Sequence, residues 1–120
     1  MAFPNPQASE TELKTFAQKL RILALEMIFK AGNGHPGGSL SLAELVTALY
    51  AKLLKHDPKN PGWKERDRFI LSKGHGVPAV YAAMALTGYF PEKELETFRQ
   101  LGSRLQGHSD RARLPGIEAS

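Results

Sequence analysis

Three of the four histidines in this chain directly follow a glycine: His35, His75 and His108. With 11 glycines in 120 residues, a given histidine follows a glycine by chance about one time in eleven, so this pattern is unexpected. An imidazole can give or take a proton near neutral pH. A glycine lets the backbone approach a ligand where a side chain would clash. The three pairs therefore predict a site that combines proton transfer with close backbone contact.

The first two histidines stand in glycine loops that lead into helices. Ser41 and Glu44 have the spacing of a capping box, and Pro78 suits the first turn of a helix. Free N–H groups and the positive end of the helix dipole make helix N-termini favourable binding sites for phosphate. Surface turns are the simpler interpretation of any one Gly-His pair. A metal site built from the three histidines is not favoured, because they lack ligand-like spacing.

Apolar periodicity predicts the elements that position these loops. A capping box at Ser9 and Glu12 opens a helix that ends at Gly32. Phe69-Ile70-Leu71 is β-prone and predicts a buried strand whose end faces the loop of His75, which is where α/β sheets bind ligands. The other expected segments are a loose start at 1–8, helices from 41 to about 54, 78–88 and 92–101, and an irregular tail at 102–120.

Composition limits the classes of function. The chain has 42% hydrophobic and 23% charged residues, which is typical of one globular domain. It has no cysteine and no apolar run long enough for a membrane span, and its first residues lack a secretory signal, so a cytoplasmic protein is expected. The net charge of +4 comes from basic residues interleaved with acids rather than from a tract, which argues against nucleic acid binding.

Three further patterns are interpreted as structural rather than functional. Gly32, Gly34 and Gly37 fit the G-x-G-x-x-G string of dinucleotide folds, but a helix precedes them where that fingerprint needs a strand. His56, before Asp57-Pro58, is interpreted as a helix C-terminal residue that favours the dipole. The aromatic residues on helical faces are expected in the core: Phe16, Tyr50, Tyr81 and Phe98.

Several strings, in this order, resemble the N-terminal part of transketolases: GNGHPGG, RDRFIL followed by SKGHG, LTGYF, and FRQLGSRLQGH. The resemblance covers the chain from about Leu13 to Ser120. It implies an α/β fold, here the helix-rich front part of a thiamine diphosphate-binding (diphosphate-type) domain, with its parallel sheet incomplete. That domain would occupy residues 9–120. The implied reaction moves a two-carbon ketol unit from a ketose phosphate to an aldose phosphate.

The resemblance also assigns roles to the three histidines. His35 matches a family histidine that contacts sugar hydroxyls and helps to shuttle protons, so it is the expected catalytic and substrate-binding residue. His75 matches a histidine beside the diphosphate and thiazolium of the cofactor. His108 matches one that lines the donor end of the substrate channel. After His108 this chain has Ser109-Asp110 where many relatives have Pro-Glu, so the carboxylate is kept but one carbon shorter.

Parts of the family pattern are not in this sequence. The Gly-Asp-Gly motif that holds Mg²⁺ or Ca²⁺, and the pyrimidine-binding domain with its activating glutamate, do not occur in the 120 residues. The metal ligands are therefore expected outside this chain, and the chain is not expected to turn over substrate by itself. The expected partners are sugar phosphates, a C-terminal transketolase subunit or remaining chain, and a homodimer mate.

Two alternatives stay open from the sequence. One is a fragment of a related thiamine diphosphate synthase of the deoxyxylulose phosphate type, although its loops usually depart from GHPGG and SKGHG. The other is a non-catalytic binding or dimerisation module. A pure scaffold would have no need of all three Gly-His pairs.

Overall fold

The computed structural model describes residues 3–32 and 34–119. Four residues lie outside the described part: 1, 2, 33 and 120. They fall at the ends of the expected segments 1–8 and 9–120 and, for Asn33, within the GNGHPGG string. The elements are α1 (Glu10–Ala31), α2 (Pro36–Ala48), the π-helical turn η1 (Leu49–Leu53), the 3₁₀ turn η2 (Gly74–Gly76), α3 (Val77–Thr87) and the 3₁₀ helix η3 (Glu92–Thr97).

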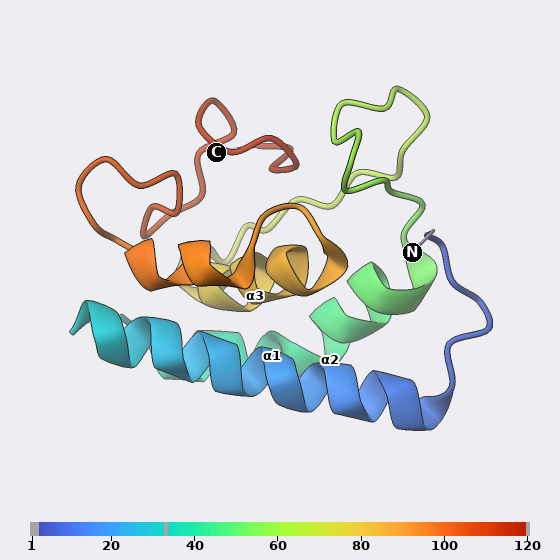
Figure 1. Cartoon of the computed structure of the whole chain (residues 1–120), viewed down its shortest axis with the longest axis horizontal. Coiled ribbons are helices and arrows are strands. Elements are labelled where there is room, and N and C mark those ends of the chain that lie inside the picture. The colour runs from blue at the N-terminus through green and yellow to red at the C-terminus, as the bar shows by residue number, and fades with distance from the viewer. Residues whose placement is uncertain (1–2, 33, 120) are drawn as a thin grey trace.

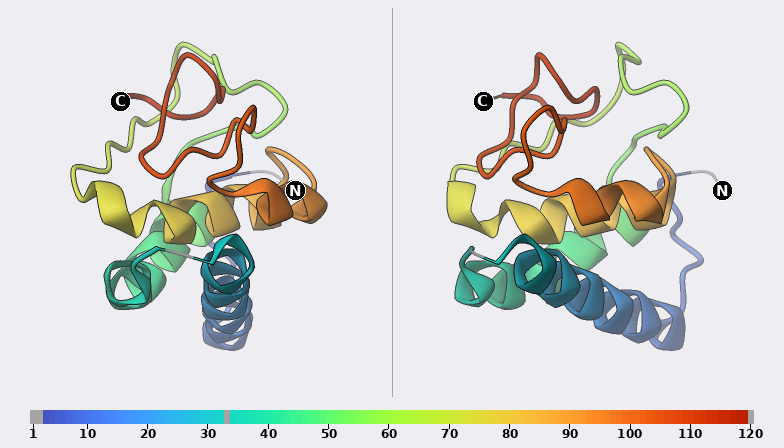
Figure 2. Two further views of the ribbon diagram at one scale, coloured as in Figure 1. Left: turned by 90° about the vertical axis from the view of Figure 1, so that its left-hand side faces the viewer. Right: turned by 60° about the vertical axis from the view of Figure 1, so that its left-hand side comes forward.

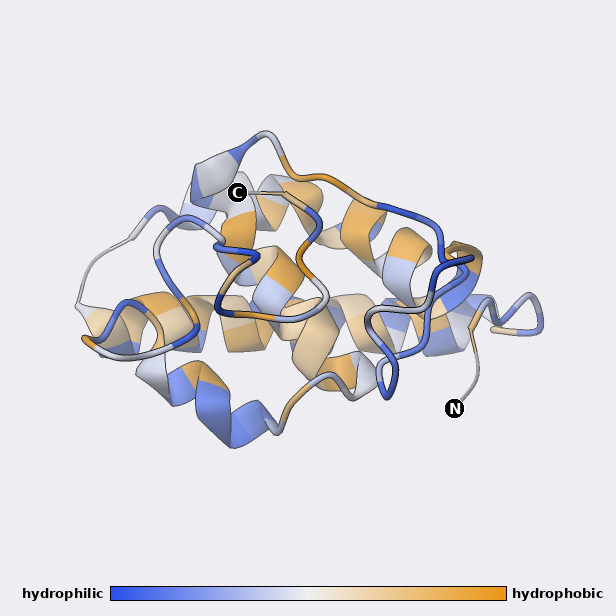
Figure 3. Ribbon diagram, turned by 90° about the horizontal axis from the view of Figure 1, so that it is seen from above, coloured by the Kyte–Doolittle hydropathy of each residue, from blue (hydrophilic) through white to orange (hydrophobic). Residues whose placement is uncertain are grey.

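Helix α3 is the centre of the fold. Every residue from Val77 to Ala85 is buried, so this helix is apolar on all sides and lies within the core. Helices α1 and α2 and the short η3 pack around it. Figure 1 shows α1 and α2 below α3, with η3 beside it and the long connections above, and Figure 2 shows the same layering from two other sides. Colouring by hydropathy places apolar residues along the helices and polar residues along the upper loops (Figure 3).

The sequence predicted α1 closely. Ser9 is its N-cap and accepts a hydrogen bond from the Glu12 backbone N–H at 3.1 Å, as the capping box predicts. The helix ends at Gly32, whose φ of 77° is a left-handed conformation that favours glycine. Apolar residues spaced three and four apart face the core: Ala17, Leu20, Ala24 and Met27.

The predicted start of α2 was wrong. The helix begins at Pro36 rather than Ser41, with His35 in extended conformation as its N-cap. Proline is pre-organised for the first helical turn and loses no hydrogen bond there, so the two glycines that follow it enter the helix. Ser41 does not cap; its hydroxyl donates to the Gly38 carbonyl at 3.1 Å. The helix then widens into η1 instead of continuing to about residue 54.

No strand occurs within residues 3–32 and 34–119, so the expected parallel sheet is not present in this part of the molecule. The run Phe69-Ile70-Leu71 forms no regular element, but its side chains alternate as in a strand: Ile70 is 61% exposed while Phe69 and Leu71 pack against the core. It has no neighbouring strand to pair with. The described residues therefore form a helix-rich layer. The predicted helix 92–101 is shorter than expected, since only the 3₁₀ helix η3 forms there.

The segment before α1 differs from the loose conformation expected for it. Phe3 is buried and stacks on the imidazole of His56, with ring centroids 4.4 Å apart. The Asn5 backbone N–H donates to the Lys52 carbonyl at 2.9 Å. No helix among the described residues is long and apolar enough to cross a bilayer.

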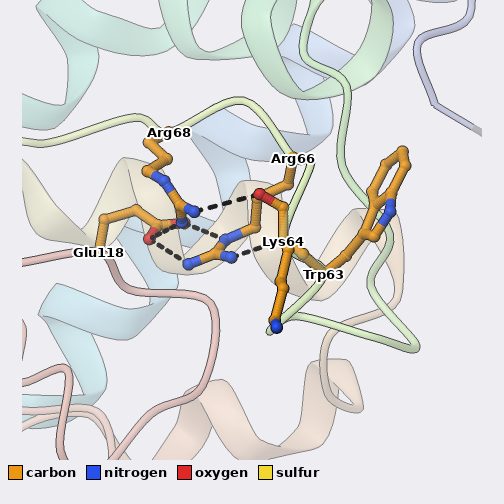
Figure 4. A network of polar contacts seen from close by, with 5 residues as sticks. All are labelled: Trp63, Lys64, Arg66, Arg68 and Glu118. Carbon is orange, nitrogen blue, oxygen red and sulfur yellow. Dashed lines mark hydrogen bonds and ion pairs between the residues drawn. The ribbon is translucent and has the colours of Figure 1, made fainter.

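The long loop 54–73 and the tail 102–119 lie together on the side of the molecule opposite α1 (Figures 1 and 2). Glu118 joins them: Arg66 donates to both of its carboxylate oxygens, at 2.8 and 2.7 Å, and Arg68 contacts it at 3.5 Å. Figure 4 shows these two guanidiniums converging on the carboxylate, with the carbonyls of Trp63 and Lys64 accepting their remaining bonds. The arginines lower the pKa of the Glu118 carboxyl. This bidentate pair ties the tail to the loop.

Candidate functional site

The three histidines that follow glycines come together in one ring cluster. The His35 and His75 ring centroids are 4.3 Å apart, and the His75 and His108 centroids are 4.9 Å apart. They come from the N-cap of α2, the 3₁₀ turn before α3 and the tail, which are separated by 40 and 33 positions in the sequence. All three side chains are exposed. Their convergence shows that the Gly-His pattern marks one place in the fold.

The glycines before these histidines have identifiable packing roles. A Cβ at Gly74 would lie 2.8 Å from Nδ1 of His108, so any larger residue would displace that ring. A Cβ at Gly107 would lie 3.0 Å from Nη1 of Arg99. Gly34 has a φ of 131°, which side chains rarely adopt, and a Cβ there would lie 3.2 Å from Ile28. Each glycine therefore allows a close approach or a backbone turn beside its histidine.

The starts of α2 and α3 cross next to the cluster with their backbones nearly in contact. A Cβ at Gly76 would lie 3.4 Å from the Gly38 carbonyl oxygen and 2.6 Å from Cδ1 of Leu42. The hydroxyl of Ser39, which is 1% exposed, donates to the Gly76 carbonyl at 3.3 Å and accepts from the Ala79 N–H at 3.2 Å. Because Gly76, the N-cap of α3, has no side chain, Ser39 caps α3 from the neighbouring helix.

Two cationic side chains border the cluster. Lys73 donates from Nζ to the Ser41 hydroxyl at 2.7 Å and lies close to Gly38. Arg99 packs its guanidinium on Gly107, next to His108. The neighbouring His35, partial desolvation, His108 and Arg99 together lower the pKa of His75, so its imidazole is neutral at pH 7. A neutral imidazole can accept a proton or a hydrogen bond.

The fourth histidine provides a contrast. His56 is buried, and its Nε2 lies 2.9 Å from the Tyr50 carbonyl, which can only accept, so Nε2 carries the proton. Its Nδ1 then accepts from the Tyr89 hydroxyl at 2.7 Å. Burial lowers the pKa of His56. Both of its nitrogens are used within the fold, and its bond to the Tyr50 carbonyl lies at the end of η1, in agreement with the interpretation of His56 as a helix C-terminal residue. Its role is structural.

By contrast, none of the imidazoles of His35, His75 and His108 hydrogen-bonds to another residue within 3–32 and 34–119. Their ring nitrogens are therefore not used by the described part of the fold. No group of three His, Cys, Asp or Glu side chains that could hold a metal ion occurs in those ranges. The arrangement can offer proton donors and acceptors beside two cations.

A separate groove lies between α1 and η3 and has a volume of about 400 Å³. It contains none of the three histidines, and its charged residues include Lys30 and Glu96, which pair with each other. Its lining holds glutamates and lysines but no imidazole, so the open surface around the three histidines is the better candidate site.

Sequence reasoning did not single out Ser39, Lys73 or Arg99. Ser39 was overlooked because the helix was expected to begin two residues after it. Lys73 was visible only as part of the SKGHG string, and nothing in the sequence indicated that it would reach Ser41. For Arg99 no local signal exists, since its contact with Gly107 depends on how the tail turns.

Comparison with known proteins is consistent with this geometry. Residues 13–120 match the transketolase thiamine diphosphate-binding domain, and the chain belongs to this family. It is 53% identical over 109 residues to a 6-deoxy-6-sulfo-D-fructose transketolase subunit of Clostridium sp. (strain MSTE9), covering 91% of this chain and 40% of the relative. It is 45% identical to the transketolase of Treponema pallidum (strain Nichols), covering 93% of this chain and 17% of that enzyme.

Solved structures agree. The transketolase from Leishmania mexicana superposes with a TM-score of 0.84 at 35% identity, covering 88% of this chain and 16% of that one. The transketolase from Campylobacter jejuni superposes with a TM-score of 0.80 at 42% identity, again over 88% and 16%. The chain thus spans well under half the length of the relatives it matches. The resemblance seen in its motifs is confirmed.

Proposed function

We propose that this chain is the front part of a transketolase that moves a two-carbon ketol unit from a ketose phosphate to an aldose phosphate, and that it requires further residues or a partner chain for activity. The observation that carries the proposal is the ring cluster, in which three separate loops bring His35, His75 and His108 together with their ring nitrogens unused by the described residues. A pure scaffold would not need this arrangement.

The residues present fit thiamine diphosphate. The crossing of α2 and α3 leaves backbone exposed at the start of α2, where a Cβ at Gly37 would meet nothing within 4 Å, and Lys73 adds a positive charge there. These are features that suit a diphosphate. When bound, thiamine diphosphate supplies the electron sink for cleavage of the carbon–carbon bond. We assign His75 to contact with the cofactor.

The other two histidines would act on the sugar. His35 would contact sugar hydroxyls and take or give a proton at a ring nitrogen, and His108 would bind the donor end of the substrate. We further propose that Mg²⁺ or Ca²⁺ accompanies the cofactor and is held by ligands outside this chain.

The partners follow from the same proposal. The Clostridium relative is named as a subunit, which supports assembly with a C-terminal transketolase subunit as one arrangement; remaining residues of a longer chain are the other. Such residues would also supply the strands that complete a parallel sheet beside 69–71. A homodimer mate and a cytoplasmic location are part of the proposal.

A chimera tests this function. Residues 13–119 of the chain would replace the matching stretch of the Treponema pallidum transketolase, to which it is 45% identical. We expect ketol transfer from xylulose 5-phosphate to ribose 5-phosphate by the chimera and none by the 120-residue chain alone. In the chimera, His35→Ala should lower kcat by about 10²- to 10⁴-fold, as for loss of a general acid or base. Lys19→Ala, at an exposed position on α1, is the matched control.

The alternatives give different results. A folded chimera that binds thiamine diphosphate but transfers no ketol unit would indicate a non-catalytic module. Condensation of pyruvate with glyceraldehyde 3-phosphate, without ketol transfer, would indicate a synthase of the deoxyxylulose phosphate type. Steady ketol transfer by the chain alone would contradict the need for a partner.

A further inference from the structure

Arg99 has an unusual backbone conformation for a residue with a long side chain. Among the described residues it is the one non-glycine residue with positive φ, at 64°. This left-handed conformation is unfavourable for a residue with a Cβ, and it persists where the surroundings fix it. Here the Arg99 N–H donates to the carbonyl of the fully buried Leu105 at 2.9 Å, which closes the loop 99–105 at its base.

The guanidinium of Arg99 lies directly against the residue before His108. A Cβ at Gly107 would be 3.0 Å from its Nη1 and 3.3 Å from its Cζ. Within the part of the chain that the structure describes, this guanidinium forms no ion pair, whereas those of Arg66 and Arg104 each bind a glutamate. The three atoms nearest to a Cβ built at Gly107 all belong to the Arg99 side chain.

The contact continues from Gly107 into the ring cluster. The His108 ring meets the His75 ring edge to face, and it lies so close to Gly74 that a Cβ there would be 2.8 Å from Nδ1. His108 therefore lies between two glycines: its ring packs against Gly74, and its backbone follows Gly107. A shift of the loop 99–107 would move His108 away from His75.

We propose that Arg99 is a positioning residue that holds His108 against His75 through the packing of its guanidinium on Gly107. The role of His108 toward a sugar rests on the proposed function, but the positioning itself is a property of this chain. The positive charge of Arg99 has a second effect. Together with His35, desolvation and His108, it lowers the pKa of His75.

Three variants of the full 120-residue chain separate the contributions. Arg99→Gly removes the guanidinium but keeps, and relaxes, the left-handed backbone, so folding should be retained. Arg99→Lys keeps the charge without the planar group. Leu101→Gly is the matched control, because Leu101 lies in the same loop with its side chain fully exposed. Each variant would be studied by NMR, with pH titration of the histidine ring protons and nuclear Overhauser effects between the rings.

In Arg99→Gly we expect the Overhauser contact between His75 and His108 to weaken by at least about half, while the His35–His75 contact remains. The pKa of His75 should rise only slightly, because His35 and desolvation, which lower it most, are unchanged. In Arg99→Lys the His75–His108 contact should still be weakened, because lysine lacks the planar group. In Leu101→Gly the contact and the pKa should both match the parent chain. An unchanged His75–His108 contact in folded Arg99→Gly would overturn the proposal, as would full rescue of that contact by lysine.

The same change in the Treponema chimera gives an independent measurement. Because Arg99 packs on Gly107 beside His108, Arg99→Gly should raise KM for the ketose donor or lower kcat by about tenfold or more, and should change thiamine diphosphate affinity by much less than that. An inactive parent chimera would refute the proposed function and leave the NMR result to decide the positioning role. Equal loss of cofactor affinity and activity would instead indicate a general structural defect and overturn the proposal.

Discussion

Ser39→Ala should destabilise the fold markedly, because Ser39 joins the starts of two helices. Its hydroxyl satisfies the Ala79 N–H and the Gly76 carbonyl, both in buried surroundings, at 3.2 and 3.3 Å. A net contribution of about 1 kcal/mol for each bond predicts a loss of about 2 kcal/mol in the free energy of unfolding. With about 2.1 cal/mol/K of unfolding entropy per residue, the 120-residue chain should lose about 8 °C in Tm.

Ser41→Ala is the matched control, since it removes an exposed hydroxyl from the same helix. That hydroxyl bonds the Gly38 carbonyl and Lys73, both within reach of water. Its loss should cost no more than about 0.5 kcal/mol. Urea denaturation followed by circular dichroism, with a thermal scan, measures both variants. A Ser39→Ala chain within about 0.5 kcal/mol of the parent, or one no less stable than Ser41→Ala, would refute the idea that Ser39 caps α3.

Two further predictions concern charged groups. Glu118→Gln should lower the free energy of unfolding by about 3 kcal/mol, because it leaves Arg66, a guanidinium only 17% exposed, without its carboxylate. In the same urea titration, Glu96→Gln should leave the free energy of unfolding nearly unchanged, because the Lys30–Glu96 pair is exposed to solvent. Since Arg66 lowers the pKa of Glu118, this pair contributes to the free energy of unfolding above pH 4.5. That contribution is lost as pH falls through the lowered pKa. For His56, burial lowers the pKa, so its contribution is present above pH 6.5 and is lost as pH falls toward the lowered pKa. His56→Gln should flatten the stability profile below pH 6.5, and an unchanged slope there would contradict the assignment.

The sequence predicted those parts of the fold that depend on local chemistry. The capping box at Ser9 and the glycine that ends α1 act within one turn, so their spacing is sufficient to place the helix. At α2 two local signals competed, and the proline at the first turn outweighed the box at Ser41. The β-prone run 69–71 failed for a different reason. A strand requires a partner, and the described residues contain none, although the alternation of exposure is visible.

The sequence singled out the residues of the candidate site but could not give their geometry. The Gly-His pairs identified the three loops, while the distances between the rings depend on how α2, α3 and the tail pack together. Ser39 and Arg99 could not be found because their roles depend on contacts 37 to 40 and 8 positions away, respectively. Nothing in the neighbouring residues marks such contacts.

The ring cluster also has a consequence for folding. Because its three members are separated by 40 and 33 positions, the cluster forms only after long-range packing is complete, whereas α1 can form early from local bonds. Helical content and site formation are therefore separate measures of the state of the chain. A preparation with full helical circular dichroism but separated imidazole rings would be a compact, incompletely packed form, and the histidine NMR signals would identify it where a helicity measurement would not.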